Sequence, residues 1–180
     1  SGNNASLSWT TPYCYPETES EILTYGEGDI YYSWTSICYA HRYLAEDIAQ
    51  YANMLIFKTS TYVNYTGTYT VYIYTGTKNN KPDPDALAST ATIYCTSDTG
   101  WKELILNEPV TISGNKDLWI VMKQENTGVT YPTPSFNLDT YNENACYTGS
   151  SPTQISPISN SYKISWLIKA YLTDGTHTYN

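Results

Sequence analysis

The residue types used most often in hydrolytic catalysis are sparse in this chain of 180 residues. Its two histidines are His41, in a segment that alternates like a strand, and His177 near the last residue. A serine nucleophile needs a histidine held beside it, and no Gly-x-Ser-x-Gly segment is present. Cys38 and His41 are three residues apart, so on a strand they point to opposite faces. We therefore assign no catalytic residue. A glycoside hydrolase with two carboxylates from distant segments is the less favoured alternative.

Two acidic loops have side chains that suit a hard cation. Asp83 and Asp85 lie in Lys81-Pro-Asp-Pro-Asp85, where proline stiffens the backbone between the two carboxylates. The loop Gly26-Glu-Gly28-Asp29 offers a second pair of acids. A rigid, solvated turn is the simpler interpretation of both loops. We expect no cofactor, or at most a structural calcium ion at Asp83 and Asp85.

Aromatic residues are the most distinctive feature, with 20 Tyr and 5 Trp against 2 Phe. If Tyr69 and Val71 of the predicted strand 68–75 face the core, Tyr72 and Tyr74 form a stripe on its outer face. The irregular region 124–160 mixes rings with amides. Apolar sugar faces pack on rings, while sugar hydroxyls require amides or carboxylates nearby. The predicted ligand site comprises Tyr72, Tyr74, Tyr131, Tyr141, Asn142, Asn144 and Tyr147. The alternative is that these side chains only cover a sheet face or close the ends of the fold.

The four cysteines, Cys14, Cys38, Cys95 and Cys146, are widely spaced. No pair has the C-x-x-C spacing of a zinc or redox site. Two disulfides in any of three pairings, one disulfide, or buried inert thiols all remain open. Because the composition suggests an oxidising compartment, we expect at least one disulfide.

Charge excludes several classes of partner. The net charge is −8, and the 9 Lys and Arg residues are scattered, so no basic surface for nucleic acid is expected. The same sign disfavours anionic lipid, and no window has the ~20 apolar residues that span a bilayer. Charged residues make up only 14% of the chain, against about 25% in typical soluble domains. A surface that relies on hydroxyls and amides is common in secreted β proteins.

The hydrophobic pattern predicts an all-β fold, a two-sheet antiparallel β-sandwich. Short alternating or apolar segments recur at near-regular spacing, separated by turns rich in Gly, Pro and Asn. The only helix-like segment is 44–51. We predict strands at 22–25, 30–43, 53–59, 68–75, 87–95, 101–112, 118–123 and 162–172.

Both faces of the predicted strand 118–123 are apolar, as in a central strand buried on two sides. Trp34, Trp101, Trp119 and Trp166 lie on apolar strands and are expected in the core. The predicted division of the chain is a lead-in at 1–20, a single domain at 21–173 and a loose tail at 174–180.

Several segments, in this order and spacing, resemble one known family. They are Leu7-Ser-Trp9, Leu23-Thr-Tyr25-Gly26, Thr68-Tyr-Thr-Val-Tyr-Ile-Tyr-Thr-Gly76, Gly100-Trp-Lys-Glu-Leu-Ile-Leu-Asn-Glu-Pro-Val-Thr-Ile112, Asp117-Leu-Trp-Ile-Val121 and Ile164-Ser-Trp-Leu-Ile-Lys-Ala-Tyr-Leu172. The family comprises accessory β-sandwich domains of secreted and surface adhesin-like proteins of Bacteroidetes. The resemblance implies a jelly-roll sandwich, an extracytoplasmic location and an adhesive or carbohydrate-binding role. The chain departs from the family at Tyr131-Pro-Thr-Pro134, which lacks the cysteine and aspartate of the family's segment there.

The sequence therefore favours a non-catalytic adhesion or carbohydrate-binding module of a secreted or cell-surface bacterial protein. Its expected partner is a glycan or a host or cell-surface protein, with no nucleic acid and no membrane insertion. The alternative is a structural spacer that presents other domains.

Overall fold

The computed structural model describes residues 21–26, 28–35, 37–96, 99–125 and 132–174. Strands dominate, as the abundance of Tyr, Thr and Ile predicts. The strands are β1 (Glu21–Leu23), β2 (Tyr31–Thr35), β3 (Cys38–Tyr43), β4 (Leu55–Val63), β5 (Gly67–Tyr74), β6 (Thr77–Lys78), β7 (Lys81–Pro82), β8 (Leu87–Cys95), β9 (Gly100–Thr111), β10 (Leu118–Glu125), β11 (Pro132–Asn137), β12 (Tyr147–Ser151), β13 (Gln154–Pro157), β14 (Ile164–Trp166) and β15 (Ile168–Thr173). The helices are α1 (Ala45–Ile48) and the short 3-10 helices η1 (Ala49–Tyr51), η2 (Pro84–Ala86) and η3 (Glu143–Ala145).

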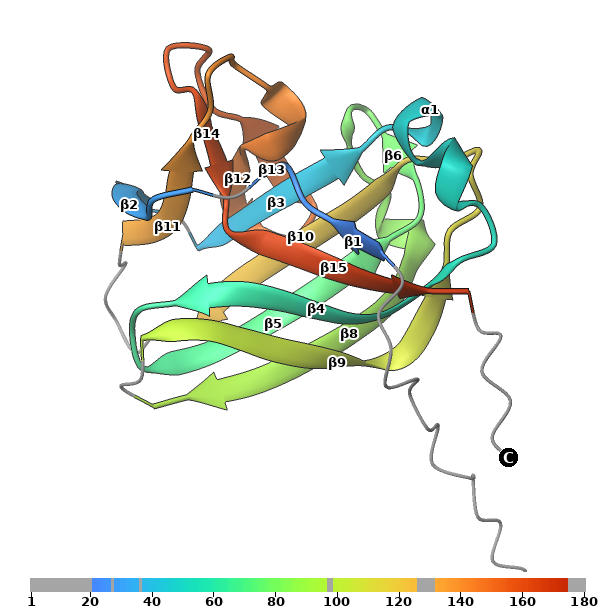
Figure 1. The fold of residues 1–180 in the computed structure, drawn as a ribbon, viewed down its shortest axis with the longest axis horizontal. Coiled ribbons are helices and arrows are strands. Elements are labelled where there is room, and N and C mark those ends of the chain that lie inside the picture. Colours follow the sequence, from blue (N-terminus) through green and yellow to red (C-terminus); the bar gives the residue numbers. More distant parts are fainter. Residues whose placement is uncertain (1–20, 27, 36, 97–98, 126–131, 175–180) are drawn as a thin grey trace, which may run out of the picture.

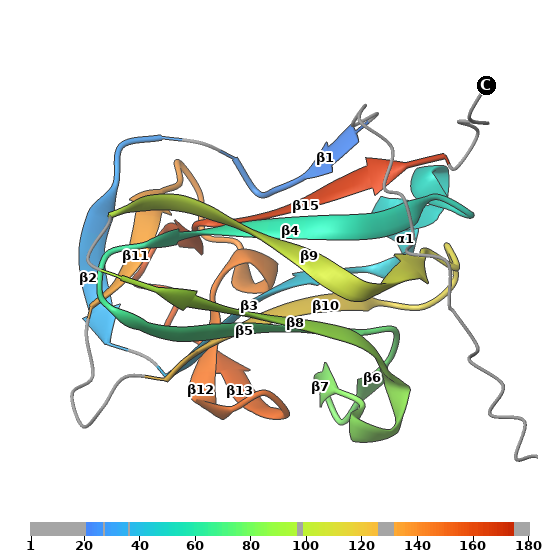
Figure 2. The ribbon, with the colours of Figure 1, turned by 90° about the horizontal axis from the view of Figure 1, so that it is seen from below.

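Two antiparallel sheets pack face to face as a sandwich (Figure 1). One has the strand order β1-β15-β4-β9, and the other has the order β13-β12-β3-β10-β5-β8. Smaller sheets are β14-β11-β2, at one end of the sandwich, and the hairpin β6-β7 (Figure 2). The prediction of an all-β, two-sheet antiparallel sandwich is confirmed.

The strand order is that of a jelly roll. Taking β1, β3, β4, β5, β8, β9, β10 and β15 as strands one to eight, the four-stranded sheet runs 1-8-3-6. The corresponding part of the six-stranded sheet runs 2-7-4-5. Among these eight strands, each successive pair crosses from one sheet to the other, except β5 and β8, which are neighbours in one sheet. Two interlocked Greek keys of this kind define a jelly roll.

The main core fills the space between the two sheets. β5 contributes Tyr69, Val71 and Ile73, and β10 contributes Ile120 and Met122. Their alternation follows the period of two that separates the faces of a strand. Trp119 and Trp166 are fully buried, as predicted. The side chain of Trp34 lies outside the described residues.

A second apolar cluster lies on the opposite face of the six-stranded sheet. Trp119 and Val121 alternate with the β10 residues of the main core, so they point to the other side. The cluster comprises Cys38, Ala40, Tyr74, Trp119, Val121, Tyr147 and Ile155. Figure 2 shows β12, β13 and the β6-β7 hairpin on this side. The prediction that β10 is buried on both faces is therefore confirmed.

The helical segment predicted at 44–51 is α1 followed directly by η1. None of the helices in the described ranges is long and apolar enough to cross a membrane. The predicted lead-in, 1–20, lies outside the described residues, as does the predicted tail, 174–180, apart from Asp174.

Candidate functional site

Trp101 lies on the outer face of the four-stranded sheet, and 41% of its surface is exposed. The expectation that it belongs to the core is wrong. The buried residues of β9 are Leu104, Leu106 and Val110, so Trp101, Glu103 and Ile105 point outward. The prediction failed because Ile105, on the same outward face, is also apolar, so this exposed face has the apolar alternation of a core face.

Other rings lie beside Trp101 on this face. Tyr62 of β4 is its register partner, and the two rings meet edge to face with centroids 6.0 Å apart. The Lys169 ammonium of β15 lies 4.6 Å from the centre of the Trp101 indole. Tyr171, also on β15, has the Lys58 ammonium 4.3 Å from its ring centre. Cation–π contacts of this kind are favourable and hold the side chains against one another.

Polar groups fill the space between these rings. Lys58 pairs with Glu103 at 2.9 Å, and the Ser60 and Tyr171 hydroxyls are 3.1 Å apart. We call this surface the aromatic platform, and it comprises Lys58, Ser60, Tyr62, Trp101, Glu103, Lys169 and Tyr171. It combines a partly exposed indole with amines, a carboxylate and hydroxyls. That combination suits a ligand with apolar faces and many hydroxyl groups.

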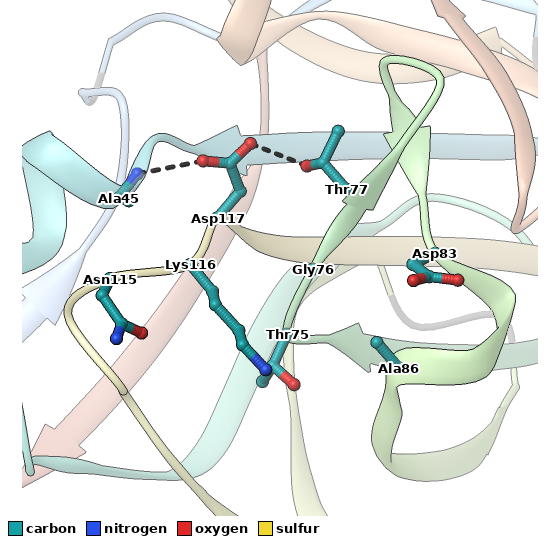
Figure 3. Close-up of a pocket in the computed structure, with 9 residues that line it drawn as sticks. All are labelled: Ala45, Thr75, Gly76, Thr77, Asp83, Ala86, Asn115, Lys116 and Asp117. Carbon is teal, nitrogen blue, oxygen red and sulfur yellow. Dashed lines mark hydrogen bonds between the residues drawn. The ribbon is translucent and has the colours of Figure 1, made fainter.

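A polar cavity of about 390 Å³ lies at one end of the six-stranded sheet (Figure 3). Its lining residues come from α1, the β5–β6 segment, the β7–β8 segment and the loop before β10, and they are Ala45, Thr75, Gly76, Thr77, Asp83, Ala86, Asn115, Lys116 and Asp117. Figure 3 shows Asp117 between Ala45 and Thr77, with Asp83 on another wall. This cavity lacks an aromatic ring among its lining residues.

Asp117 joins four segments at the edge of this cavity. Its carboxylate accepts hydrogen bonds from Arg42 Nη2 at 2.7 Å, from Thr77 Oγ1 at 2.7 Å and from the Ala45 N–H at 3.1 Å. Thr77 in turn accepts a hydrogen bond from Trp119 Nε1 at 2.9 Å. Burial alone raises the pKa of this carboxyl, but these donors stabilise the charged form, and the pKa lies below its ordinary value. Asp117 therefore links β3, α1 and β6 to the loop before β10 at this end of the six-stranded sheet.

Replacing Asp117 with asparagine is expected to lower the free energy of unfolding by about 2–3 kcal/mol, because Arg42 loses its counter-charge. Urea denaturation at neutral pH measures the change. The matched control is Asp85→Asn, since Asp85 is exposed and pairs with Lys78 at 3.4 Å. Exposed pairs contribute about 0–1 kcal/mol. Equal stabilities of the two variants would contradict this role.

The predicted tyrosine stripe on the outer face of β5 is largely covered. Tyr74 is only 4% exposed, and Tyr147 of β12 is 0% exposed. The expectation that both lie at the surface is wrong, because they pack in the second apolar cluster, where Tyr147 meets Trp119 at 4.7 Å. Tyr72 packs at the margin of this cluster and remains half-buried.

The other predicted ligand residues stabilise the loop around η3. Tyr141 donates a hydrogen bond to the Ile158 carbonyl oxygen at 2.9 Å. The Asn142 side chain accepts from the Asn144 N–H at 3.0 Å and so caps η3. Tyr141 packs against the main core, whereas Tyr72 packs against the second apolar cluster. Tyr131 lies outside the described residues. Ligand binding by any of these side chains stays a prediction.

The two predicted calcium ligands form local contacts. Asp83 Oδ1 accepts a hydrogen bond from the Asp85 N–H at 3.1 Å, which caps η2. The carboxylate of Asp85 extends to Lys78. Among the described residues, no group of three or more His, Cys, Asp or Glu side chains is arranged to hold a metal ion. Calcium at Asp83 and Asp85 stays a prediction.

No disulfide joins the three described cysteines, Cys38, Cys95 and Cys146, to one another, and all three are buried. Burial raises the pKa of Cys38 to about 12 and that of Cys146 to about 11. Thiols with such pKa values are poor nucleophiles. This arrangement agrees with the alternative of buried, inert thiols, while Cys14 lies outside the described residues.

His41 is also enclosed. Its ring nitrogens lie 3.2 Å from the Tyr43 hydroxyl and 3.0 Å from Ser165 Oγ. His41 and Ser165 are both 0% exposed, so a substrate cannot reach this serine–histidine pair. The interpretation of His41 as a hydrogen-bonded strand residue is confirmed.

Family models, curated proteins and solved structures each gave no match.

Proposed function

We propose that this protein is a non-catalytic carbohydrate-binding or adhesion module of a secreted or cell-surface protein, and that it binds glycan on the aromatic platform. The observation that carries the proposal is the exposed Trp101 on a rigid sheet, next to Tyr62 and beneath Lys169. A large apolar ring at the surface of a β-strand is a ready anchor for a ligand, because few rotamers are lost on binding.

The chemistry of the surroundings supports a saccharide. The C–H face of a sugar ring packs on an indole, while its hydroxyls need donors and acceptors at the margin of the contact. Lys58 and Glu103 supply both kinds of group, and they are already held in place by their ion pair. A flat, polar surface leaves much water in the interface, so we expect each site to bind glycan with low affinity. Adhesion then requires several copies acting together.

Three further observations support this class of function. The jelly-roll strand order agrees with the resemblance to accessory domains of Bacteroidetes adhesin-like proteins. The net charge of −8 disfavours nucleic acid as the partner. The enclosed His41 supports the non-catalytic part of the proposal, since the serine beside it is inaccessible.

Replacing Trp101 with alanine is expected to weaken glycan binding at least about tenfold, as for a central aromatic residue of an interface. A glycan and mucin array with the purified protein identifies ligands, and titration calorimetry with a bound glycan measures the loss. Melting temperatures of the variant and the wild type show that the fold is kept.

The matched control is Tyr94→Ala on β8. Tyr94 is an exposed ring on the six-stranded sheet, away from the aromatic platform. This variant and Tyr72→Ala are expected to bind as the wild type does. If Tyr72→Ala loses binding while Trp101→Ala keeps it, the ligand binds on the six-stranded sheet instead.

A structural spacer is the second candidate. The burial of Tyr74 and Tyr147 favours it, because these rings serve packing rather than recognition. An array on which the wild type binds no glycan would support the spacer and contradict the proposed function.

A further inference from the structure

Exposed apolar side chains continue beyond Trp101 on the outer face of the four-stranded sheet. Ile105, also on β9, is 55% exposed, and Ile22 of the edge strand β1 is 43% exposed. We propose that this face binds an internal stretch of a polysaccharide chain, several sugar units long, that extends along β9 from Trp101 to Ile105. The inference rests on the proposed function and names the ligand class of the same site.

The register of the strands arranges the outward side chains in three rows across the sheet, because side chains at paired positions share a face. The rows are Tyr62–Trp101, then Lys169–Ser60–Glu103, then Ile22–Tyr171–Lys58–Ile105. A strand rises about 3.3 Å per residue, so Trp101 in the first row and Ile105 in the third are about 13 Å apart along β9. Ile105 and Ile22 thus extend the aromatic platform to a third row with exposed apolar surface at each end.

The chemistry alternates along β9. Trp101 and Ile105 present apolar surface, and Glu103 lies between them on the same face with 57% of its side chain exposed. An ionised carboxylate has about four acceptor positions, so Glu103 can accept hydrogen bonds from a ligand while it pairs with Lys58. A glycan chain offers matching groups, because each sugar has a C–H face and a set of hydroxyls. Consecutive sugars can therefore contact Trp101, Glu103 and Ile105 in turn.

The openness of the face favours the middle of a chain over its end. A site for one terminal sugar encloses that sugar in a concave pocket. Trp101, Glu103 and Ile105 instead lie on one strand and contact a ligand from one side, which leaves the chain free to continue past both ends of the row. A single sugar is comparable in width to the indole on which it packs. Only a longer chain buries Trp101 and Ile105 together.

The experiment measures how affinity depends on chain length. The probes are linear xylan, mannan, galactan and glucan, each as the intact polymer and as fragments from the single sugar to the hexasaccharide, titrated by calorimetry. We expect the affinity for at least one series to rise with length, so that the longest fragment binds at least about tenfold more tightly than the disaccharide. With the intact polymer, more than two protein copies should bind per chain. A linear chain has only two ends, so such a ratio requires internal sites.

Three variants test the path of the chain. Trp101→Ala should weaken binding of every length. Ile105→Asn should remove the gain on lengthening and leave the affinity for the disaccharide unchanged. The matched control is Leu87→Asn, since Leu87 is an aliphatic side chain of β8, in the other sheet, that is 47% exposed. This control should bind every length as the wild type does, and melting temperatures show that each variant is folded.

The outcomes separate this inference from the proposed function. Trp101-dependent binding that is already maximal for a single sugar or disaccharide, or that is confined to array glycans outside the four polymers, overturns the inference and leaves the proposed function intact. A gain with length that Ile105→Asn retains also overturns the inference, because the chain then leaves Trp101 in another direction. Failure of the wild type to bind any array glycan or any of these probes overturns both.

Discussion

Replacing Trp166 with alanine is expected to lower the free energy of unfolding by about 3–5 kcal/mol, the usual cost of removing a buried tryptophan. Trp166 is 0% exposed, and its ring packs against Tyr39 with centroids 5.8 Å apart. Its indole N–H also donates a hydrogen bond to the Tyr147 carbonyl oxygen at 2.7 Å. The substitution therefore opens a cavity and leaves a buried acceptor without its donor. Urea denaturation at neutral pH measures the loss.

Two variants test this assignment. Trp166→Phe keeps most of the apolar volume and removes the indole donor, so it is expected to cost less than Trp166→Ala. Trp101→Ala removes the same side chain from an exposed position and is expected to cost least. A Trp166→Ala protein as stable as Trp101→Ala would show that the burial of Trp166 does not stabilise the fold.

Acidification from pH 6.5 to pH 5 is expected to destabilise the protein by about 2 kcal/mol through His41 alone. Burial disfavours the charged imidazole and lowers the pKa of His41 from 6.5 to about 3 in the folded state. Between these two values the unfolded chain binds a proton that the folded protein does not, so stability falls as the pH falls. Below about pH 6 the limiting slope is about 1.4 kcal/mol per pH unit, and it persists until the pH approaches 3.

The measurement is a set of urea denaturation curves at pH 7, 6.5, 6, 5.5 and 5, a range that lies above the ordinary pKa of aspartate and glutamate. His41→Gln should flatten the slope, even though loss of the contacts to Tyr43 and Ser165 lowers its stability at every pH. His177→Gln gives the contribution of the chain's other histidine. An unchanged slope in the His41→Gln variant would falsify the assignment.

The fold class was predictable because it depends on local pattern. Neighbouring residues alone indicate where strands and turns form. The indicators here were the alternation along 68–75, the apolar residues on both faces of 118–123 and the turn residues between strands. The same reasoning placed Trp119 and Trp166 in the core. It failed for Trp101, because an outward strand face that carries Trp101 and Ile105 has the same period of two as an inward face.

The candidate site was less predictable because it depends on contacts between distant strands. Trp101, Tyr62 and Lys169 meet only when β9, β4 and β15 lie side by side in one register. No spacing within the chain predicts that register. The same limit explains Tyr74, which is buried in one apolar cluster with Tyr147, a residue more than 70 positions further along the chain. The sequence offers one signal: Glu103 follows Trp101 by two residues, so on a strand this charged residue shares the face of Trp101.

The pairing of β1 with β15 determines how the domain responds to tension. Glu21 is paired with Leu172, so the chain enters and leaves these strands at the same end of one antiparallel pair (Figure 1). A force applied through the flanking segments therefore loads the hydrogen bonds of the β1–β15 pair one after another, as in opening a zipper, rather than all at once in shear. Because β1 has only three residues, we expect this pair to separate before the rest of the sandwich. We expect the edge strand to detach before Trp101 and Tyr62, on β9 and β4, are disturbed.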